Sequence, residues 1–333
     1  MSMKVGIVWN PSKVDGTELR EAFDAALSEE ALSEVATAGV DAHWFETTET
    51  DPGGGAAGEA LAAGCALVIA AGGDGTVRAV AERLGAPGQD GTDGAASAGG
   101  ADADLGIVPL GTGNLLARNL GVPLGDPRAA FARALTAAAS PLDLGEVTFT
   151  SPDGDEATQG FVVMAGFGID AQMIAETDDE LKAKAGWLAY VESLGRAAAG
   201  TEVVDFVLEV DGGEPLPEQA HTVLIANCGS LQGGVTLMPD ARPDDGELDL
   251  LVLRAADAGG WLDSMRNMVW DNGVKRLVTG SEEAESSAST GRLRARTAKF
   301  TLSTPLAFEI DGDEVGEVSE FEVRVFAGAL RVR

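Results

Sequence analysis

The sequence has few of the residues on which several kinds of protein chemistry depend. Only two histidines, His43 and His221, and two cysteines, Cys65 and Cys228, occur among its 333 residues. The histidines lie far apart in expected strands, which argues against a zinc site or a His-dependent nucleophile. Both cysteines stand in apolar runs, so we expect buried free thiols and no disulfide framework.

Aromatic residues are also scarce, at 5% of the chain, although hydrophobic residues make up 45%. The interior must therefore be built mainly from Ala, Val, Leu and Ile, and a chain of 333 residues is long enough for two such cores. No apolar run reaches the roughly 18 residues of a membrane-spanning helix. The N-terminus enters a strand without the basic and apolar regions of a leader. We expect a cytoplasmic protein and leave open a peripheral contact with the inner membrane face.

Positive charge is the third scarcity, because 23 Lys and Arg residues stand against 54 Asp and Glu, a net charge of -31. In molar salt the Debye length falls to about 3 Å and the self-repulsion of such a surface is screened. We therefore interpret the chain as halophilic. An acidic, partly disordered protein is the alternative, but apolar strands alternate with helices along the chain. Nucleic acid is an unsuitable partner, since binding phosphates requires clustered Lys and Arg.

The first part of the chain alternates strands and helices. Apolar runs predict strands at 5–9, 40–45, 66–71 and 105–109, and helical periodicity predicts helices at 17–32, 56–63, 77–84 and 127–139. Residues 85–104 are rich in Gly, Ala and Asp and are interpreted as an exposed loop. This order predicts a parallel sheet covered by helices on both faces.

The second part of the chain consists mainly of strands. We expect them at 142–150, 161–165, 203–210, 222–226, 248–253, 293–302 and 306–310, with helices at 181–199 and 261–269 and a polar loop at 280–291. This order predicts a β-sandwich-type domain, and a last strand at 329–332 is expected to return to the first domain. The expected domains are therefore 1–141 with 327–333, an α/β nucleotide-binding domain, and 142–326, a β-rich acceptor-binding domain.

The strongest motif is Gly72-Gly73-Asp74-Gly75-Thr76, directly after the strand at 66–71. Glycines there let the backbone approach a ligand closely, and the helix that follows points its positive end at the same place. A carboxylate at Asp74 could hold Mg²⁺ or accept a proton. The alternative is an ordinary turn between strand and helix, in which the aspartate serves only as a cap.

A second block, Pro109-Leu110-Gly111-Thr112-Gly113-Asn114, repeats this order of strand, small residues and helix. Two turns suited to phosphate would then lie at the carboxyl ends of strands in one sheet, where open α/β folds bind ligands. Neither block fits the P-loop or the dinucleotide fingerprint, which disfavours a dehydrogenase. The sequence predicts a different phosphate-binding arrangement.

Together these blocks resemble the catalytic domain shared by diacylglycerol kinases, sphingosine kinases and their bacterial lipid-kinase relatives. That fold is similar to those of NAD kinase and phosphofructokinase, a doubly wound, Rossmann-like domain followed by a β-sandwich-type domain. Further matching blocks follow in order over nearly the whole chain: Asn10-Pro11, 166–171, Asn227, 239–241, 245–249 and 311–313. Several ordered blocks are more specific than any one of them.

The resemblance implies roles for individual residues, with ATP and Mg²⁺ as cofactors. Asp74 would lie near the γ-phosphate and its Mg²⁺, and Asp311 would be the general base or a metal-organising acid. A structural Mg²⁺ would be held by the Asp245 carboxylate and the backbone carbonyls of Arg242 and Glu247. The residues implied to line the nucleotide are Asn10, Gly72, Gly73, Gly75, Thr76, Gly111, Thr112, Gly113 and Asn114.

Some of these residues also have simpler interpretations. Asp311-Gly312 and Asp245-Gly246 are, by themselves, signals for hairpin turns. Where the family usually has Asp-Gly-Glu, this chain has Asp311-Gly312-Asp313, so the second acid is one methylene shorter.

Two further patterns have both a structural and a functional interpretation. The alternation Arg292, Arg294, Arg296 places cations on one strand face, either as a solvated edge or to meet an anionic headgroup. The apolar stretch at 187–194, near Lys182 and Lys184, is either core or an interfacial helix.

The function implied is an ATP- and Mg-dependent lipid kinase that phosphorylates a diacylglycerol-like or isoprenoid-glycerol lipid at the membrane surface. The first domain would hold ATP and the second would present the acceptor hydroxyl, with Asp311 taking its proton. One alternative is an NAD-kinase-like phosphotransferase, although that family has an Asn-Glu/Asp motif where this chain has Gly111-Thr112-Gly113-Asn114. Another is an inactive nucleotide-binding regulatory module. A homodimer is left open.

Overall fold

The computed structural model describes residues 2–29, 32, 39–85, 103–168, 203–230, 237–253 and 290–333. The chain divides into two compact units. The first unit comprises Met1–Leu144, Asp244–Gly246 and Phe326–Arg333, and the second comprises Gly145–Pro243 and Glu247–Val325. Within the described ranges, no helix is long and apolar enough to cross a membrane.

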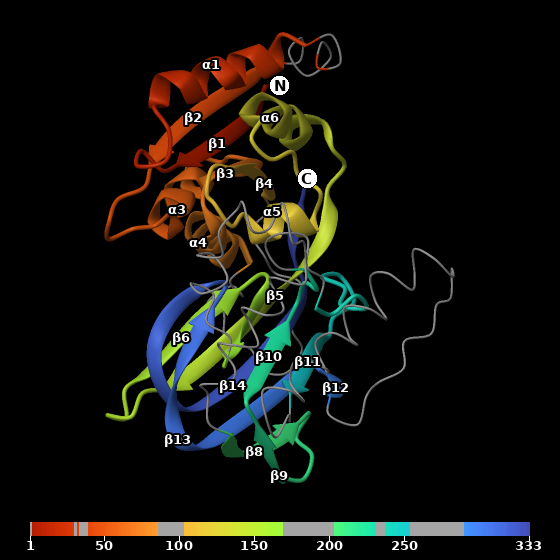
Figure 1. Ribbon diagram of the computed structural model, residues 1–333. Coiled ribbons are helices and arrows are strands. Elements are labelled where there is room, and N and C mark those ends of the chain that lie inside the picture. The colour runs from red at the N-terminus through yellow and green to blue at the C-terminus, as the bar shows by residue number, and fades with distance from the viewer. Residues whose placement is uncertain are drawn as a thin grey trace, which may run out of the picture. The chain divides into compact units, whose positions relative to one another are not determined.

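The first unit is built on a parallel sheet (Figure 1). Its strands are β1 (Met3–Trp9), β2 (Val40–Glu46), β3 (Leu67–Gly72) and β4 (Asp104–Pro109), in the order β2-β1-β3-β4. Every residue of β3 and β4 is buried, as expected for parallel strands covered on both faces. The end of the last strand, β14 (Asp313–Val332), lies parallel to β4 through the pair Val332 and Leu105.

Within the described ranges, four helices cover this sheet in two pairs, and a fifth, short helix contacts β4 (Figure 1). The helices are α1 (Gly16–Leu27), α3 (Gly54–Ala62), α4 (Asp74–Gly85), α5 (Leu115–Asn119) and α6 (Pro127–Thr136). Helix α1 packs on α6, with the rings of Phe23 and Phe131 5.2 Å apart, and α3 packs on α4. Aspartates at the predicted N-termini cap two of the helices, Asp15 for α1 and Asp126 for α6.

The second unit is a mainly antiparallel β structure (Figure 1). Its aromatic core is centred on Phe321, whose ring lies 4.5 Å from that of Phe300 and 4.6 Å from that of Phe308. Besides most of β14, its strands are β5 (Ser140–Thr150, from Gly145 on), β6 (Glu156–Phe161), β7 (Met164–Phe167), β8 (Val204–Val210), β9 (Leu216–Ala220), β10 (Thr222–Ala226), β11 (Leu248–Leu253), β12 (Thr290–Ala295) and β13 (Thr297–Ile310).

Several predicted strand boundaries were wrong. The expected strand at 293–302 breaks at Arg296, because the Asp211 carboxylate accepts the backbone N–H groups of Arg296 and Thr297 and so interrupts the ladder. The expected strand at 161–165 divides between β6 and β7. The last two residues of the expected loop at 280–291 belong to β12, and the last strand is far longer than 329–332.

Two helix ends also differ from the prediction. Helix α1 ends at Leu27, where the N–H and the hydroxyl of the C-cap residue Ser28 both donate to the Asp24 carbonyl. Helix α6 ends at Thr136, short of 139, where the backbone at Ala137 is already extended. The expected helices at 181–199 and 261–269, with the stretch at 187–194, lie outside the described residues.

Candidate functional site

The first glycine-rich turn joins β3 to α4. A Cβ atom on Gly72 would lie 2.6 Å from the Cβ of Thr76, closer than real Cβ atoms approach, so only glycine fits there. The Gly73 carbonyl accepts the Val77 N–H at 3.0 Å and starts the helix. The turn therefore leaves the first N–H groups of α4 at the carboxyl end of the sheet, where helix ends bind anions.

The second glycine-rich turn packs directly on the first. The Leu110 N–H donates to the Gly72 carbonyl at 2.8 Å. A Cβ atom on Gly111 would lie 2.7 Å from the Gly73 Cα, and one on Gly113 would lie 2.7 Å from an Asp74 carboxylate oxygen. Glycine is thus required at Gly111 by the close approach of two backbones and is favoured at Gly113 by the Asp74 carboxylate. The structure brings the two predicted turns together at the ends of adjacent strands.

Asp74 links the two turns. Its Oδ2 accepts the Asn114 N–H at 2.7 Å and its Oδ1 accepts the Leu115 N–H at 2.5 Å. Both donors lie at the start of α5, where a carboxylate is stabilised by unsatisfied N–H groups. The half-buried carboxylate is therefore held in one orientation between the turns.

Asn114 shapes the second turn from inside. Its φ of 48° is left-handed, and its side chain is buried. Its Oδ1 accepts the Gly111 N–H at 2.9 Å and its Nδ2 donates to the Gly111 carbonyl at 2.7 Å. Arg118 donates from Nε to the Gly113 carbonyl at 2.6 Å, while Thr112 is exposed at the tip. The Asn114 amide thus holds the turn, a contact that the sequence did not predict.

Asn10 occupies the corresponding position at the end of β1. Its N–H donates to the Ala71 carbonyl at 3.1 Å, which places it beside the end of β3. Its side-chain oxygen accepts the N–H and the hydroxyl of Ser12 at 2.9 and 2.7 Å. The implied nucleotide residues therefore all come from the carboxyl ends of β1, β3 and β4, within the first unit.

Asp311 lies in the second unit, in the two-residue turn between β13 and β14. With Gly312 it has positive φ, 50° and 88°, which confirms the hairpin signal read from the sequence. Its carboxylate is buried and accepts the backbone N–H groups of Val162, Val163 and Met164 at 2.8 to 2.9 Å. A carboxylate has about four lone-pair positions. Three backbone donors therefore use most of its accepting capacity.

Buried side chains surround the segment that Asp311 binds. The Asn227 Nδ2 donates to the Val162 carbonyl at 3.1 Å, and the Cys228 thiol lies 3.5 Å from the same oxygen. Burial raises the pKa of Cys228, and the Asp311 charge raises it further, so this thiol is not a nucleophile. Asp311 is thus part of a buried polar network around the segment between β6 and β7.

Asp143 is a candidate that the sequence did not single out. In the first unit its two carboxylate oxygens accept the N–H groups of Gly246 at 2.7 Å and Gly328 at 2.6 Å. Burial raises its pKa above the usual value, and the charges of Asp245 and Asp244 raise it further. The sequence signal that could have identified Asp143 is its charge, which stands between two leucines in the expected strand at 142–150. Asp143 anchors the segment that carries Asp245.

The residues implied to hold a structural Mg²⁺ are divided between the units, with Asp245 in the first and Arg242 and Glu247 in the second. Asp245 would supply a carboxylate, and Arg242 and Glu247 would supply backbone carbonyls, the ligand type that Mg²⁺ prefers. Burial is the main cause of the raised pKa of Asp143, and the charges of Asp245 and Asp244 add to it. No group of three or more His, Cys, Asp or Glu side chains suited to a metal occurs in the described ranges. Water would have to complete the coordination, as is usual for Mg²⁺.

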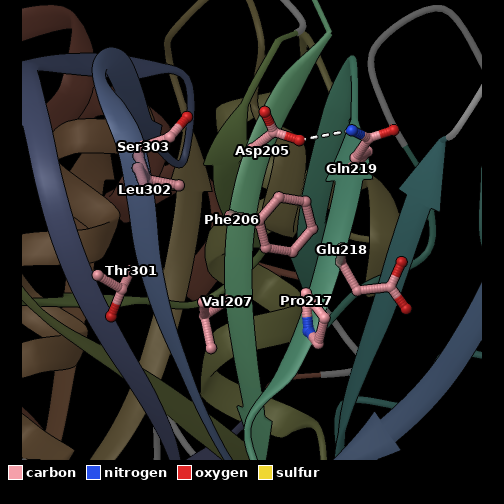
Figure 2. Close-up of a pocket in the computed structure, with 9 residues that line it drawn as sticks. All are labelled: Asp205, Phe206, Val207, Pro217, Glu218, Gln219, Thr301, Leu302 and Ser303. Atoms are coloured by element: carbon pink, nitrogen blue, oxygen red, sulfur yellow. Dashed lines mark hydrogen bonds between the residues drawn. The ribbon is translucent and has the colours of Figure 1, made fainter.

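The second unit also contains an open pocket of about 690 Å³. Figure 2 shows its lining on β8, β9 and β13, with Phe206 at its centre and the Asp205 carboxylate bonded to the Gln219 amide at 2.5 Å. None of the predicted site residues lines it, and its lining contains two carboxylates and no cation. Its chemistry does not suit a nucleotide phosphate.

Comparison with protein families gives two matches that together cover most of the chain. Residues 14–147 match the family described as "Diacylglycerol kinase catalytic domain". Residues 162–333 match the family described as "YegS C-terminal NAD kinase beta sandwich-like domain". The family and the fold class inferred from the sequence are thereby confirmed.

Individual relatives agree with these matches. The chain is 34% identical over 282 residues to a "Probable lipid kinase YegS-like" of Pseudomonas aeruginosa, covering 82% of this chain and 78% of the relative. It is 29% identical over 251 residues to a "Diacylglycerol kinase" of Bacillus subtilis, covering 75% and 74%. A crystal structure of a diacylglycerol kinase from Bacillus anthracis superposes with a TM-score of 0.64 at 19% identity, covering 99% and 96%, which shows the same fold.

Proposed function

Since this chain belongs to the family of diacylglycerol kinases and YegS-like lipid kinases, phosphotransferases that act on alcohols, we propose that it is an ATP- and Mg²⁺-dependent kinase of a lipid hydroxyl. The observation that carries the proposal is the contact between two glycine turns with Asp74 held between them. The acceptor we propose is a diacylglycerol-like or isoprenoid-glycerol lipid at the membrane surface.

In this proposal the first unit binds the nucleotide. The N–H groups at the start of α4 and the turn from Gly111 to Gly113 face the phosphates, and the α4 dipole favours their charge. Asp74 is fixed by its two backbone donors. It would lie beside the γ-phosphate and hold the catalytic metal. Mg²⁺ there would neutralise charge on the phosphates. Phosphoryl transfer depends mainly on such positioning, so a rigid turn would contribute to the rate by holding the phosphates in place.

The role of Asp311 has two competing descriptions. The family resemblance implies that it is the general base or a metal-organising acid, whereas its three backbone hydrogen bonds support an anchoring role at Val162, Val163 and Met164. A base role predicts that Asp311→Asn loses about 10²–10⁴ in rate at unchanged stability. An anchoring role predicts a lower Tm as well, because the Asn NH₂ would face a backbone donor. We favour the anchoring role.

The test incubates the protein with labelled ATP, Mg²⁺ and a total lipid extract. We expect a phosphorylated lipid, and Asp74→Asn should abolish both lipid phosphorylation and slow ATP hydrolysis. Glu314→Gln is the matched control, since Glu314 is exposed on the same hairpin, lies outside the 311–313 block and should retain activity. Labelled NADP formed from added NAD would favour the NAD-kinase-like alternative. ATP binding without any transfer would favour the inactive regulatory module.

Three finer features belong to the same proposal. We propose that the enzyme acts in the cytoplasm, meets its lipid through transient peripheral contact, and works in molar salt because of its charge of -31. A homodimer is compatible with this proposal. Flotation with vesicles of the source lipids, over a range of salt concentrations, tests the peripheral contact.

A further inference from the structure

Arg118, on the short helix α5 of the first unit, is bonded to the second glycine-rich turn through only one of its donors. Its Nε donates to the Gly113 carbonyl at 2.6 Å. Within the part of the chain that the structure describes, neither terminal nitrogen of its guanidinium has a hydrogen-bond or ion-pair partner. A guanidinium carries five N–H donors in a rigid fork, so four of the five remain for another acceptor beside the turn.

The local backbone determines where this guanidinium lies. The Arg118 N–H donates to the Asn114 carbonyl at 3.0 Å, so Arg118 belongs to the first helical turn after the glycines. Its half-buried side chain returns to Gly113, five residues earlier. The Nε bond restricts a side chain that otherwise has many rotamers. Much of the entropic cost of ordering Arg118 is therefore incurred before any ligand binds.

Arg133, on α6 of the same unit, shows a purely structural use of an arginine. Its NH1 and NH2 donate to the carbonyls of Gly121 and Leu120 at 3.2 and 3.0 Å, just beyond the end of α5, where a helix leaves carbonyls without partners. Arg118 has the opposite arrangement, because the protein uses its Nε and not its terminal nitrogens. Parallel N–H donors of this kind can bond two oxygens of one phosphate.

The position of Gly113 indicates which phosphate would accept these bonds. A Cβ atom on Gly113 would lie 2.7 Å from the Asp74 Oδ2, so the residue that holds Arg118 is in contact with Asp74. In the proposed function Asp74 lies beside the γ-phosphate. The terminal phosphate of a nucleoside triphosphate is therefore the acceptor nearest to the guanidinium. A fixed cation matters here, because a chain of charge -31 otherwise repels an anionic ligand.

We propose that Arg118 binds the γ-phosphate of ATP and gives the site a preference for ATP over ADP. The inference rests on the proposed function, because it takes the turn from Gly111 to Gly113 as part of the nucleotide site. Hydrogen bonds to a charged group contribute about 10–100-fold in affinity. Removing the guanidinium should weaken the binding of ATP by about this factor and leave that of ADP nearly unchanged.

The experiment measures the Kd of a non-hydrolysable ATP analogue and the Kd of ADP for the full chain, at constant high salt and constant Mg²⁺. We expect Arg118→Met to reduce the preference for the ATP analogue over ADP by about 10–100-fold. Arg118→Lys keeps the charge but loses the rigid fork, so its preference should lie between those of Arg118→Met and the wild type.

Arg83→Met is the matched control, because it removes the same charge from the same unit. Arg83 is exposed in the last turn of α4, about 14 Å along the helix from Asp74. Its loss changes the general repulsion of anions by the chain without changing the turn. The preference of Arg83→Met for the ATP analogue over ADP should therefore equal that of the wild type.

The outcomes separate the inference from the proposed function. Equal weakening of both ligands in Arg118→Met would mean that Arg118 only supports the turn, and unchanged affinities would mean that it does neither. Either result overturns the inference and leaves the proposed kinase standing. A wild type that binds neither ligand overturns the nucleotide site and the inference with it. If Arg118→Met does not fold, Arg118→Gln decides instead, because its uncharged amide can still donate to the Gly113 carbonyl.

Discussion

Replacing Gly111 by alanine is the most direct test of whether the two glycine turns form one site. The added Cβ would lie 2.7 Å from the Gly73 Cα and 3.0 Å from the Asn114 Oδ1. Carbon atoms in contact are normally about 3.5–4.0 Å apart, so the turns must separate by about 1 Å. The obstacle is backbone, which cannot rotate away as a flexible side chain could.

The expected magnitudes follow from this displacement. Overpacking of this kind costs about 1–3 kcal/mol. Alanine also lowers the conformational entropy of the unfolded chain, which stabilises the folded protein by about 0.4–1 kcal/mol. The net loss of stability should therefore be about 1–2 kcal/mol. A 1 Å misplacement of groups that position a substrate costs about 10²-fold in rate. Activity should therefore fall much further than stability.

The assay combines chemical denaturation with ATP affinity and transfer to lipid. Gly54→Ala is the matched control, since a Cβ there meets nothing closer than 3.8 Å at the start of α3 and should be neutral or slightly stabilising. Wild-type ATP affinity and transfer in Gly111→Ala would show that the contact between the turns is not part of the nucleotide site.

Three further predictions concern stability. The buried Asp104 carboxylate pairs with Arg331 at 2.9 Å and Arg333 at 2.6 Å. Changing Asp104 to Asn should lower the free energy of unfolding by about 2 kcal/mol, as measured by chemical denaturation. Although burial acts to raise it, the backbone N–H groups around α3 hold the pKa of Asp51 below its usual 3.8. The stability advantage of wild type over Asp51→Ala should thus be present above pH 3.8 and disappear as the pH falls below it, in denaturation curves at several pH values. With a charge of -31, the Tm should rise from low to molar salt, and a flat or falling Tm would refute the halophilic interpretation.

The first unit was predictable because each of its strands carries a complete local signal. Strands β3 and β4 are mainly apolar runs followed by glycines, a pattern typical of strands in a covered parallel sheet. Asp15 and Asp126 mark helix starts by an interaction between near neighbours in the sequence. Apolar runs and helix caps depend only on residues close together in the sequence, so they can be recognised without the tertiary structure.

The second unit was less predictable because its strand ends depend on distant partners. The break at Arg296 is made by Asp211, 85 residues away in the sequence. The signal for β14 was present and was not used, since apolar Phe321, Val323 and Val325 alternate with charged residues. Strand β9 contains Pro217, the exposed Gln219 and the half-buried Glu218, a composition that suits an edge strand and resembles a loop.

The candidate site shows the same division between local and distant information. The glycine turns were found from their composition, but the contact between Gly73 and Gly111 follows from the adjacency of β3 and β4, which no local pattern contains. Asp143 was overlooked because its partners, Gly246 and Gly328, lie 103 and 185 residues away.

Asp74 and Asp311 are both aspartates beside glycines, and both have been assigned to catalysis by resemblance, yet their surroundings differ in kind. Asp74 accepts two N–H groups from a turn of the proposed nucleotide site, so moving its carboxylate would move that turn. Asp311 accepts three N–H groups from a buried segment, and any substrate hydroxyl would compete with those donors for the same oxygens. Losing a buried charge-assisted acceptor leaves backbone donors unsatisfied, a cost of about 1–3 kcal/mol each. A carboxylate whose lone pairs already accept three backbone hydrogen bonds cannot take a proton without weakening them. We therefore expect Asp311→Asn to lower stability together with rate.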